Sequence, residues 1–176
     1  MIKPSVEHIL RKNGALRTNP EGRTSIELLG LYVSAGDVSL LCCLLGQPFR
    51  DRPVDVVVSP EGRSFVLAHG VAQFLMVGLN RKVDTIWAGG MANHHYAIHQ
   101  FARPLILNSR VLIVDDIVVS HDNRVKQVMS AIEGAGGQVV GVAAIYGDGT
   151  CFDQLPERIE KNLLLPALSY QEAKAA

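Results

Sequence analysis

The chain has 176 residues, of which 48% are apolar, with 17 basic and 17 acidic residues. This fits one domain with a sizeable core, and the zero formal charge gives no indication of a nucleic acid or an anionic membrane as partner. The absence of a long apolar run or signal-like N-terminus, and three cysteines in neither a disulfide nor a zinc spacing, predict a cytoplasmic protein.

The N-terminal part predicts two helices separated by a turn. Residues 5–12 are typical of a short helix, and residues 15–35 hold a cluster of turn residues before an extended segment through Leu31-Tyr32-Val33. A second helix is expected from about Asp37 to Leu45, with Asp37 as its cap. Gly46-Gln47-Pro48 would stop this helix.

From residue 54 the pattern alternates between buried strands and helices. Val54–Val58 is continuous and β-branched, which predicts a buried strand. A turn over Ser59–Ser64 leads into a helical pattern of apolar residues over Phe65–Gly78. Val83–Trp87 predicts a second strand, and Ala88–Gln100 a loop or a hairpin.

The C-terminal half repeats this alternation. Arg110–Val114 predicts a third strand, and Asp122–Gly134 a helix that Gly136-Gly137 ends. Gln138–Tyr146 predicts a fourth strand, and the tail from Asp153 is expected to be helical and peripheral. The whole order predicts an α/β fold, a parallel sheet flanked by helices on both faces.

The run from Val111 to Asn123 carries the strongest functional signal. An apolar strand ends in Asp115 and Asp116, and a short loop then leads into an amphipathic helix. Open α/β sheets bind ligands at the carboxyl ends of their strands. Paired carboxylates at this position indicate a site for a sugar or a metal ion.

This layout and the run Val111-Leu112-Ile113-Val114-Asp115-Asp116 resemble the type I phosphoribosyltransferases, most of all the orotate phosphoribosyltransferases. Asp55–Pro60 is similar to the start of the family's pyrophosphate loop, and Gly136–Val142 to the stretch after its main motif. The resemblance covers roughly residues 5–150. It implies a single domain with a small N-terminal hood, a core and a C-terminal tail, at about residues 1–36, 37–150 and 151–176.

The resemblance also implies an activity. This would be transfer of a 5-phosphoribosyl group between phosphoribosyl pyrophosphate and a nitrogen base in pyrimidine nucleotide metabolism, by a magnesium-dependent homodimer. Asp115 and Asp116 match the family's acids that hold the ribose hydroxyls, directly or through Mg²⁺, which makes both candidate metal ligands. Their charge would stabilise the ribosyl cation as pyrophosphate leaves.

The loop after the acid pair departs from the family. Val119–Asn123 stands where threonines, two glycines and a small hydroxyl residue normally surround the 5′-phosphate with N–H groups. Asp122 can instead cap the helix and repel a phosphate, while His121 and Arg124 would offset its charge. Whether this helix end is open to an anion or already capped stays an open alternative. The candidate phosphate-binding residues are Ser120, His121, Asn123 and Arg124.

Two further loops also differ from the family. Arg63-Ser64 replaces two glycines of the pyrophosphate loop, and Arg63 either binds an anion or is simply solvated. The lysine-rich loop of the orotate enzymes is replaced by a lysine-free segment that contains His94 and His95. These histidines are candidate acid–base groups or substitute cations, or else structural and exposed residues.

Three functions therefore remain for the chain. The first is the phosphoribosyltransferase itself, which the retained acid pair favours. The second is a non-catalytic nucleotide-binding or regulatory protein on the same fold, which the three altered loops favour. The third is an enzyme with changed chemistry on a phosphorylated ribose.

Overall fold

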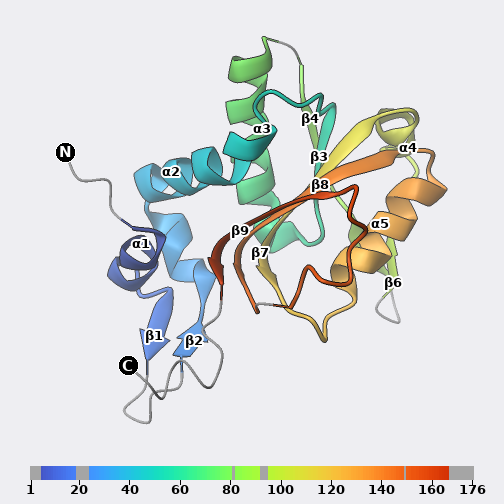
Figure 1. The fold of residues 1–176 in the computed structure, drawn as a ribbon. Coiled ribbons are helices and arrows are strands. Elements are labelled where there is room, and N and C mark those ends of the chain that lie inside the picture. Colours follow the sequence, from blue (N-terminus) through green and yellow to red (C-terminus); the bar gives the residue numbers. More distant parts are fainter. Residues whose placement is uncertain (1–4, 19–23, 81, 92–94, 149, 167–176) are drawn as a thin grey trace.

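A five-stranded parallel sheet forms the centre of the molecule (Figure 1). The computed structural model describes residues 5–18, 24–80, 82–91, 95–148 and 150–166. The strands lie in the order β4-β3-β7-β8-β9, which confirms the predicted parallel α/β architecture. Their bounds are Val56–Ser59 for β3, Asp84–Trp87 for β4, Arg110–Val118 for β7, Gln138–Gly147 for β8 and Glu160–Pro166 for β9.

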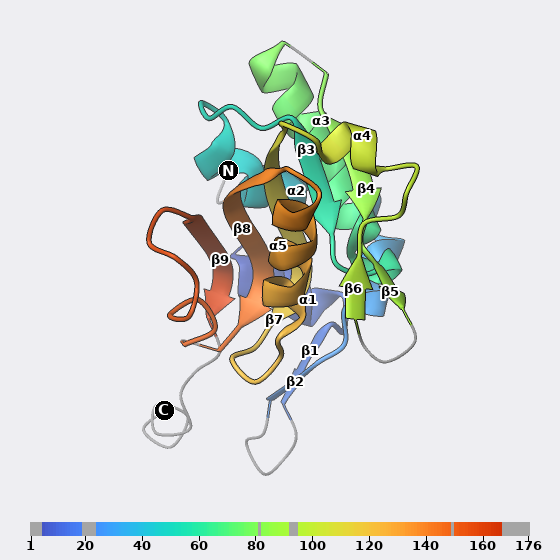
Figure 2. The same ribbon diagram turned by 90° about the vertical axis from the view of Figure 1, so that its right-hand side faces the viewer.

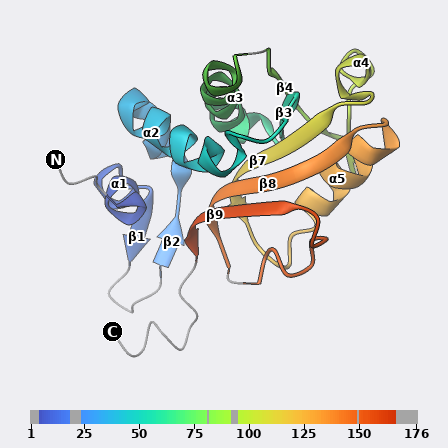
Figure 3. The ribbon, with the colours of Figure 1, turned by 45° about the horizontal axis from the view of Figure 1, so that its top comes forward.

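Helices cover both faces of this sheet, as predicted (Figures 2 and 3). Helices α2 (Ala35–Gly46) and α3 (Phe65–Leu79) share one apolar core with Leu112 and Val114 of β7. Helix α5 (Arg124–Gly134) and the short α4 (Arg103–Ile106) share a second core with the alternate residues of β7. Because successive strand residues point to opposite faces, one apolar strand supplies both cores.

The N-terminal prediction is partly wrong. Helix α1 (Val6–Lys12) is confirmed, and a short antiparallel pair follows, β1 (Leu16–Thr18) with β2 (Thr24–Ile26). The expected extended segment is instead a 3₁₀ helix over Leu28–Val33. This winding buries Leu31 completely and leaves Val33 exposed, which a continuous apolar run does not reveal.

The predicted cap of α2 is also wrong. The N-cap is Ser34, and Asp37 lies in the first turn of the helix. The Asp37 carboxylate accepts hydrogen bonds from the Asn13 amide (2.8 Å), the Ser34 hydroxyl (2.8 Å) and the Lys12 ammonium group (3.0 Å). Asp37 therefore links the end of α1 to the start of α2.

We expect Asp37 to contribute a pH-dependent part of the stability. Hydrogen bonds from Asn13, Lys12 and Ser34 lower the pKa of this carboxyl from 3.8 to about 2. A lowered folded-state pKa stabilises the fold above the ordinary value, and this contribution is lost as pH falls from 3.8 towards 2. Urea unfolding of Asp37→Asn should therefore approach the wild type across that window, whereas a constant difference would contradict this role.

The prediction of a helical, peripheral tail from Asp153 is wrong for its described part, which contributes a strand to the sheet. Residues Glu160–Pro166 form β9, which pairs in parallel with β8 at the edge of the sheet. The Asn162 side-chain amide donates to the carbonyls of Leu44 and Leu45 at the end of α2. This strand starts with charged and polar residues, so only its last part shows an apolar pattern.

The segment between β4 and α4 forms the hairpin alternative of the prediction. Strands β5 (Gly89–Met91) and β6 (His95–Ala97) pair antiparallel. Residues 92–94 between them lie outside the described part. Among the helices that the structure describes, none is long and apolar enough to span a bilayer.

Candidate active site

Asp115 and Asp116 lie in the carboxyl-terminal half of the central strand β7, which continues to Val118, so the prediction that the strand ends at the acid pair is wrong. Both are buried, with exposed fractions of 0% and 2%. Asp115 shares its strand face with Ile113, on the α5 side, and Asp116 shares its face with Val114, on the α3 side. The two carboxylates are therefore presented to different neighbouring elements.

Each buried acid is paired with one arginine. The Asp115 Oδ2 atom lies 3.3 Å from Nε of Arg124, the first residue of α5. The Asp116 Oδ2 atom lies 3.1 Å from Nε of Arg63, in the 3₁₀ turn Gly62–Ser64 after β3. Burial raises the pKa of Asp115, Arg124 lowers it and Asp116 raises it further, so the net direction is upward.

Glu61 connects the turn after β3 to the rest of the site. Its Oε1 atom accepts a hydrogen bond from the Tyr96 hydroxyl (2.9 Å) and lies 3.1 Å from Arg124 Nη1. Its Oε2 atom lies 3.4 Å from Arg63 Nε. Burial acts to raise the pKa of Glu61, but the hydrogen bonds and both arginines lower it overall. Burial and the bond to Glu61 raise the pKa of Tyr96 to about 12.

Two buried serines hold this turn in place. The hydroxyls of Ser59 and Ser64 lie 2.9 Å apart, and each donates to the Glu61 carbonyl. Buried polar groups need such partners, and here the partners belong to the turn itself. The turn thereby places the Arg63 side chain beside Asp116 of β7 and the Glu61 side chain beside Arg124 of α5.

Two aspartates occupy N–H groups of the loop between β7 and α5. Asp122 Oδ1 accepts from the Arg124 N–H (2.8 Å), and its Oδ2 atom lies 3.0 Å from Arg124 Nη2. Asp148, which follows β8, accepts from the Ser120 N–H (2.7 Å) and hydroxyl (2.9 Å). Burial acts to raise the pKa of Asp148, but the bonds from Ser120 and Thr150 lower it overall. At this helix end Asn123 is the N-cap residue and makes no side-chain capping bond, while Asp122 from the preceding position engages one N–H group, that of Arg124.

The remaining predicted residues are more scattered. His121 and Asn123 are exposed, and Asn123 lines a shallow polar groove between Tyr96 and the outer side of α5. His95 belongs to β6, where its backbone pairs with Met91. The side chain of His95 and all of His94 lie outside the described residues, so their predicted roles stay predictions.

The acid pair does not fit a directly bound metal ion. Asp115 Oδ1 accepts from the Asp116 N–H (2.9 Å), and Asp116 Oδ1 accepts from the Ile117 N–H (2.8 Å). Their Oδ2 atoms face the guanidinium groups of Arg124 and Arg63. Among the described side chains, no group of three or more histidine, cysteine or acidic residues is arranged to hold a metal ion.

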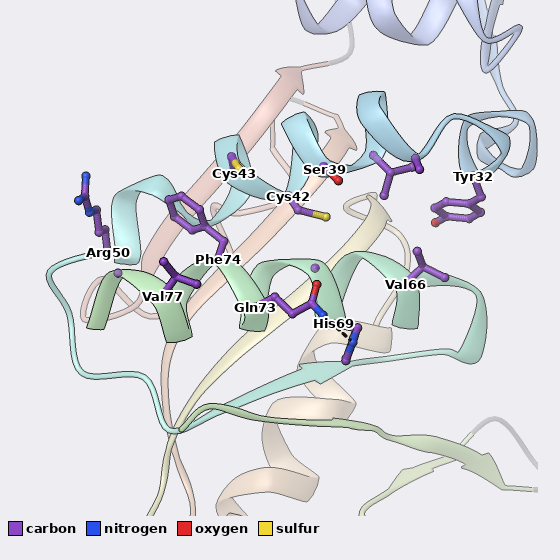
Figure 4. A pocket seen from close by; sticks show the side chains of 14 residues that line it. Tyr32, Ser39, Cys42, Cys43, Arg50, Val66, His69, Gln73, Phe74 and Val77 are labelled. Carbon is purple, nitrogen blue, oxygen red and sulfur yellow. Dashed lines mark hydrogen bonds between the residues drawn. The ribbon is translucent and has the colours of Figure 1, made fainter. Parts of the chain in front are cut away.

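A separate groove of about 670 Å³ runs between α2 and α3 (Figure 4). Tyr32 lies at one end and Arg50 at the other, with Cys42 and Phe74 between them. The buried Tyr32 hydroxyl has no hydrogen-bond partner. Burial raises the pKa of this hydroxyl, and the negative charges of the acid pair raise it further. The Tyr32 hydroxyl, at one end of the groove, therefore lies within the electrostatic influence of the acid pair.

Sequence reasoning missed Glu61, Tyr96 and Asp148 as site residues. A signal existed for two of them, because Glu61 comes two residues after β3 and Asp148 directly after β8, the parallel strands on either side of β7. Carboxyl ends of parallel strands meet at one edge of a sheet. Tyr96 had no such signal, since its place depends on how the β5–β6 hairpin packs against α5.

Comparisons with known proteins agree with this architecture. A family model described as "Phosphoribosyl transferase domain" matches residues 44–161. The adenine phosphoribosyltransferase of Clostridium perfringens is 33% identical over 104 residues, which cover 54% of this chain. Those residues span 59% of that relative, so the chain matches under two thirds of its length.

Solved structures share the fold at low identity. The adenine phosphoribosyltransferase of Rhodothermus marinus has a TM-score of 0.65 and 21% identity, and 90% of this chain and 98% of that one are covered. The orotate phosphoribosyltransferase of Mycobacterium tuberculosis, in complex with inorganic phosphate, has a TM-score of 0.65 and 19% identity, with 94% and 90% covered. With its family match, parallel sheet and acid pair, the chain belongs to the phosphoribosyltransferase domain family.

Proposed function

We propose that the protein transfers a 5-phosphoribosyl group between phosphoribosyl pyrophosphate and a nitrogen base. The observation that carries this proposal is the acid pair, Asp115 and Asp116, in the central strand of a sheet of this family. Neighbouring carboxylates can accept hydrogen bonds from vicinal ribose hydroxyls and stabilise positive charge at the anomeric carbon. The magnesium expected from the resemblance would arrive with the diphosphate of the substrate.

The roles of the other residues follow from their positions. Arg63, half-exposed at the turn after β3, would contact the leaving pyrophosphate. Ser120 and the neighbouring backbone would approach the 5′-phosphate, with His121, Asn123 and Arg124 beside them. His94 and His95, in the segment that follows Met91 in the sequence, would cover the site and supply a cation or a proton donor.

Calorimetric titration with phosphoribosyl pyrophosphate and Mg²⁺ tests the proposal. We expect saturable binding, and no heat at millimolar ligand would contradict the transferase function. Turnover with orotate and with adenine then identifies the base, since the sequence resemblance favours orotate and the curated relatives are named for adenine. A homodimer, also proposed from the resemblance, can be tested by sedimentation.

A second candidate is a non-catalytic nucleotide-binding or regulatory protein. The observation that favours it is the occupation of the Ser120 and Arg124 N–H groups by Asp148 and Asp122. Donors already engaged inside the protein are less available to a phosphate. Nucleotide binding without turnover on any base would support this second function.

Removing the Asp122 carboxylate should strengthen phosphate binding. In Asp122→Gly, the Arg124 N–H loses its internal acceptor and the nearby negative charge disappears, so we expect the Kd for inorganic phosphate to fall about tenfold. Asp122→Asn is the matched control, because it removes the charge and retains a side-chain acceptor. Calorimetry measures both variants. Weaker binding by Asp122→Gly would show that Asp122 does not obstruct the anion.

A further inference from the structure

The two buried acids are neutralised one to one by arginines of this chain. Asp115 and Arg124 are both buried, with exposed fractions of 0% and 8% for the side chains. Asp116 is equally buried, and its partner Arg63 is half-exposed. A carboxylate removed from water needs such a partner to remain charged. A cation would otherwise be required at this position.

Arg124 is fixed more firmly than an ordinary surface arginine. Its Nη1 atom lies 3.1 Å from Glu61 and its Nη2 atom 3.0 Å from Asp122. Nη2 also donates to the Ile117 carbonyl at 3.0 Å. Burial acts to lower the pKa of Arg124, but its carboxylate neighbours raise it above the ordinary value. The guanidinium therefore stays charged and in place.

The contact between Arg124 and Asp115 leaves little room for another cation. Asp115 Oδ2 and Arg124 Nε are both buried from solvent, 3.3 Å apart, without a well-directed hydrogen bond. Their attraction is electrostatic rather than directional. A hydrated divalent ion would have to displace the guanidinium and its three other contacts to reach this oxygen, and Mg²⁺ gives up its water reluctantly.

Glu61 and Asp122 do not change this conclusion. They are the further carboxylates around Arg124, and their side chains are about a third exposed, 36% and 34%. Charges with that much access to water are screened and need no bound counter-ion. Only the buried Asp115 and Asp116 therefore need a nearby positive charge, and Arg124 and Arg63 supply it.

We propose that Arg63 and Arg124 are the resident counter-cations of Asp115 and Asp116, so that the acid pair takes no divalent metal ion in the free protein. This inference rests on the proposed function only for the location of the site. It concerns the protein without substrate. A metal ion that enters with a diphosphate would be held by the diphosphate and not by the acid pair.

Mn²⁺ binding, followed by electron paramagnetic resonance on the full chain without substrate, tests the inference. We expect no saturable binding to the wild type up to about 1 mM Mn²⁺. Arg63→Gln removes the half-exposed partner of the buried Asp116, and should gain a site at least about tenfold tighter than the wild type. Adding Asp116→Asn to this variant should remove the gained site.

The outcomes separate the inference from the transferase proposal. Saturable Mn²⁺ binding by the wild type that Asp116→Asn abolishes would overturn the inference, as would a folded Arg63→Gln protein with no gain. Arg124→Gln would leave Asp115 buried without a partner and is expected to unfold more easily. For this reason Arg63→Gln is the variant that tests whether an arginine keeps the metal ion away, and circular dichroism establishes that this variant is folded. Loss of transferase activity would leave the result unchanged, because no substrate is present.

Discussion

Asp116→Asn is expected to lower kcat/KM for phosphoribosyl transfer by at least about a hundredfold, the scale at which removal of one stabilising group acts on a charged transition state. The carboxylate would stabilise the cationic ribose carbon, and an amide of the same size carries no charge to do so. Asp115→Asn should have an effect of similar size. The measurement is steady-state turnover with the base that the wild type accepts.

In these variants, a loss of activity caused by unfolding must be distinguished from a loss of transition-state stabilisation. Asp115→Asn leaves Arg124 buried beside a neutral group, and breaking a buried pair costs about 3–5 kcal/mol. Arg63 is half-exposed, so water can solvate it when Asp116 is neutralised. Asp116→Asn is therefore the cleaner test, and Asp153→Asn, at an exposed carboxylate in the turns between β8 and β9, is its control.

A folded Asp116→Asn protein with unchanged turnover would contradict the proposed role of the acid pair. Unfolding midpoints in urea establish that the variant and its control are folded under the assay conditions. If Asp153→Asn lost activity as well, the assay would be reporting general damage. The two variants together thus assign the effect to the site.

The strands that lie inside the sheet were predictable because burial on both faces leaves continuous apolar runs. β3 and β7 show such runs, and their order with the helices predicts the parallel sheet. β9 was missed because it starts with Glu160, Lys161 and Asn162, whereas β4, at the other edge of the sheet, follows an apolar residue and ends in Ile86 and Trp87.

The candidate site was predictable only in part, for a related reason. Placing Asp115 and Asp116 in a central strand required only the apolar run Val111–Val114 before them, which is local information. The pairing of Arg124 with Glu61 joins residues 63 positions apart, one at the start of α5 and the other in the turn after β3. No local pattern encodes that distance, so Arg124 was expected to face a phosphate, whereas the structure has it turned towards carboxylates.

Gly141→Ala should be among the most destabilising single substitutions of small size. A Cβ atom at Gly141 in β8 would lie 2.1 Å from Cε1 and 2.8 Å from Cζ of Phe49. Phe49 is fully buried and cannot move without disturbing the core shared with α2 and α3. Overpacking of this kind costs about 1–3 kcal/mol or more, measurable as a lower urea midpoint with an unchanged slope.

Gly134→Ala is the matched control for Gly141→Ala. Gly134 ends α5 with no atom within 4 Å of an added Cβ, and alanine in a helix is favoured over glycine by up to about 1 kcal/mol. The double variant Gly141→Ala with Phe49→Leu separates two causes. If the ring excludes the methyl group, the smaller side chain should relieve part of the cost, and the two substitutions will be non-additive. Simple additivity would contradict this, and would place the requirement for glycine in the backbone of β8.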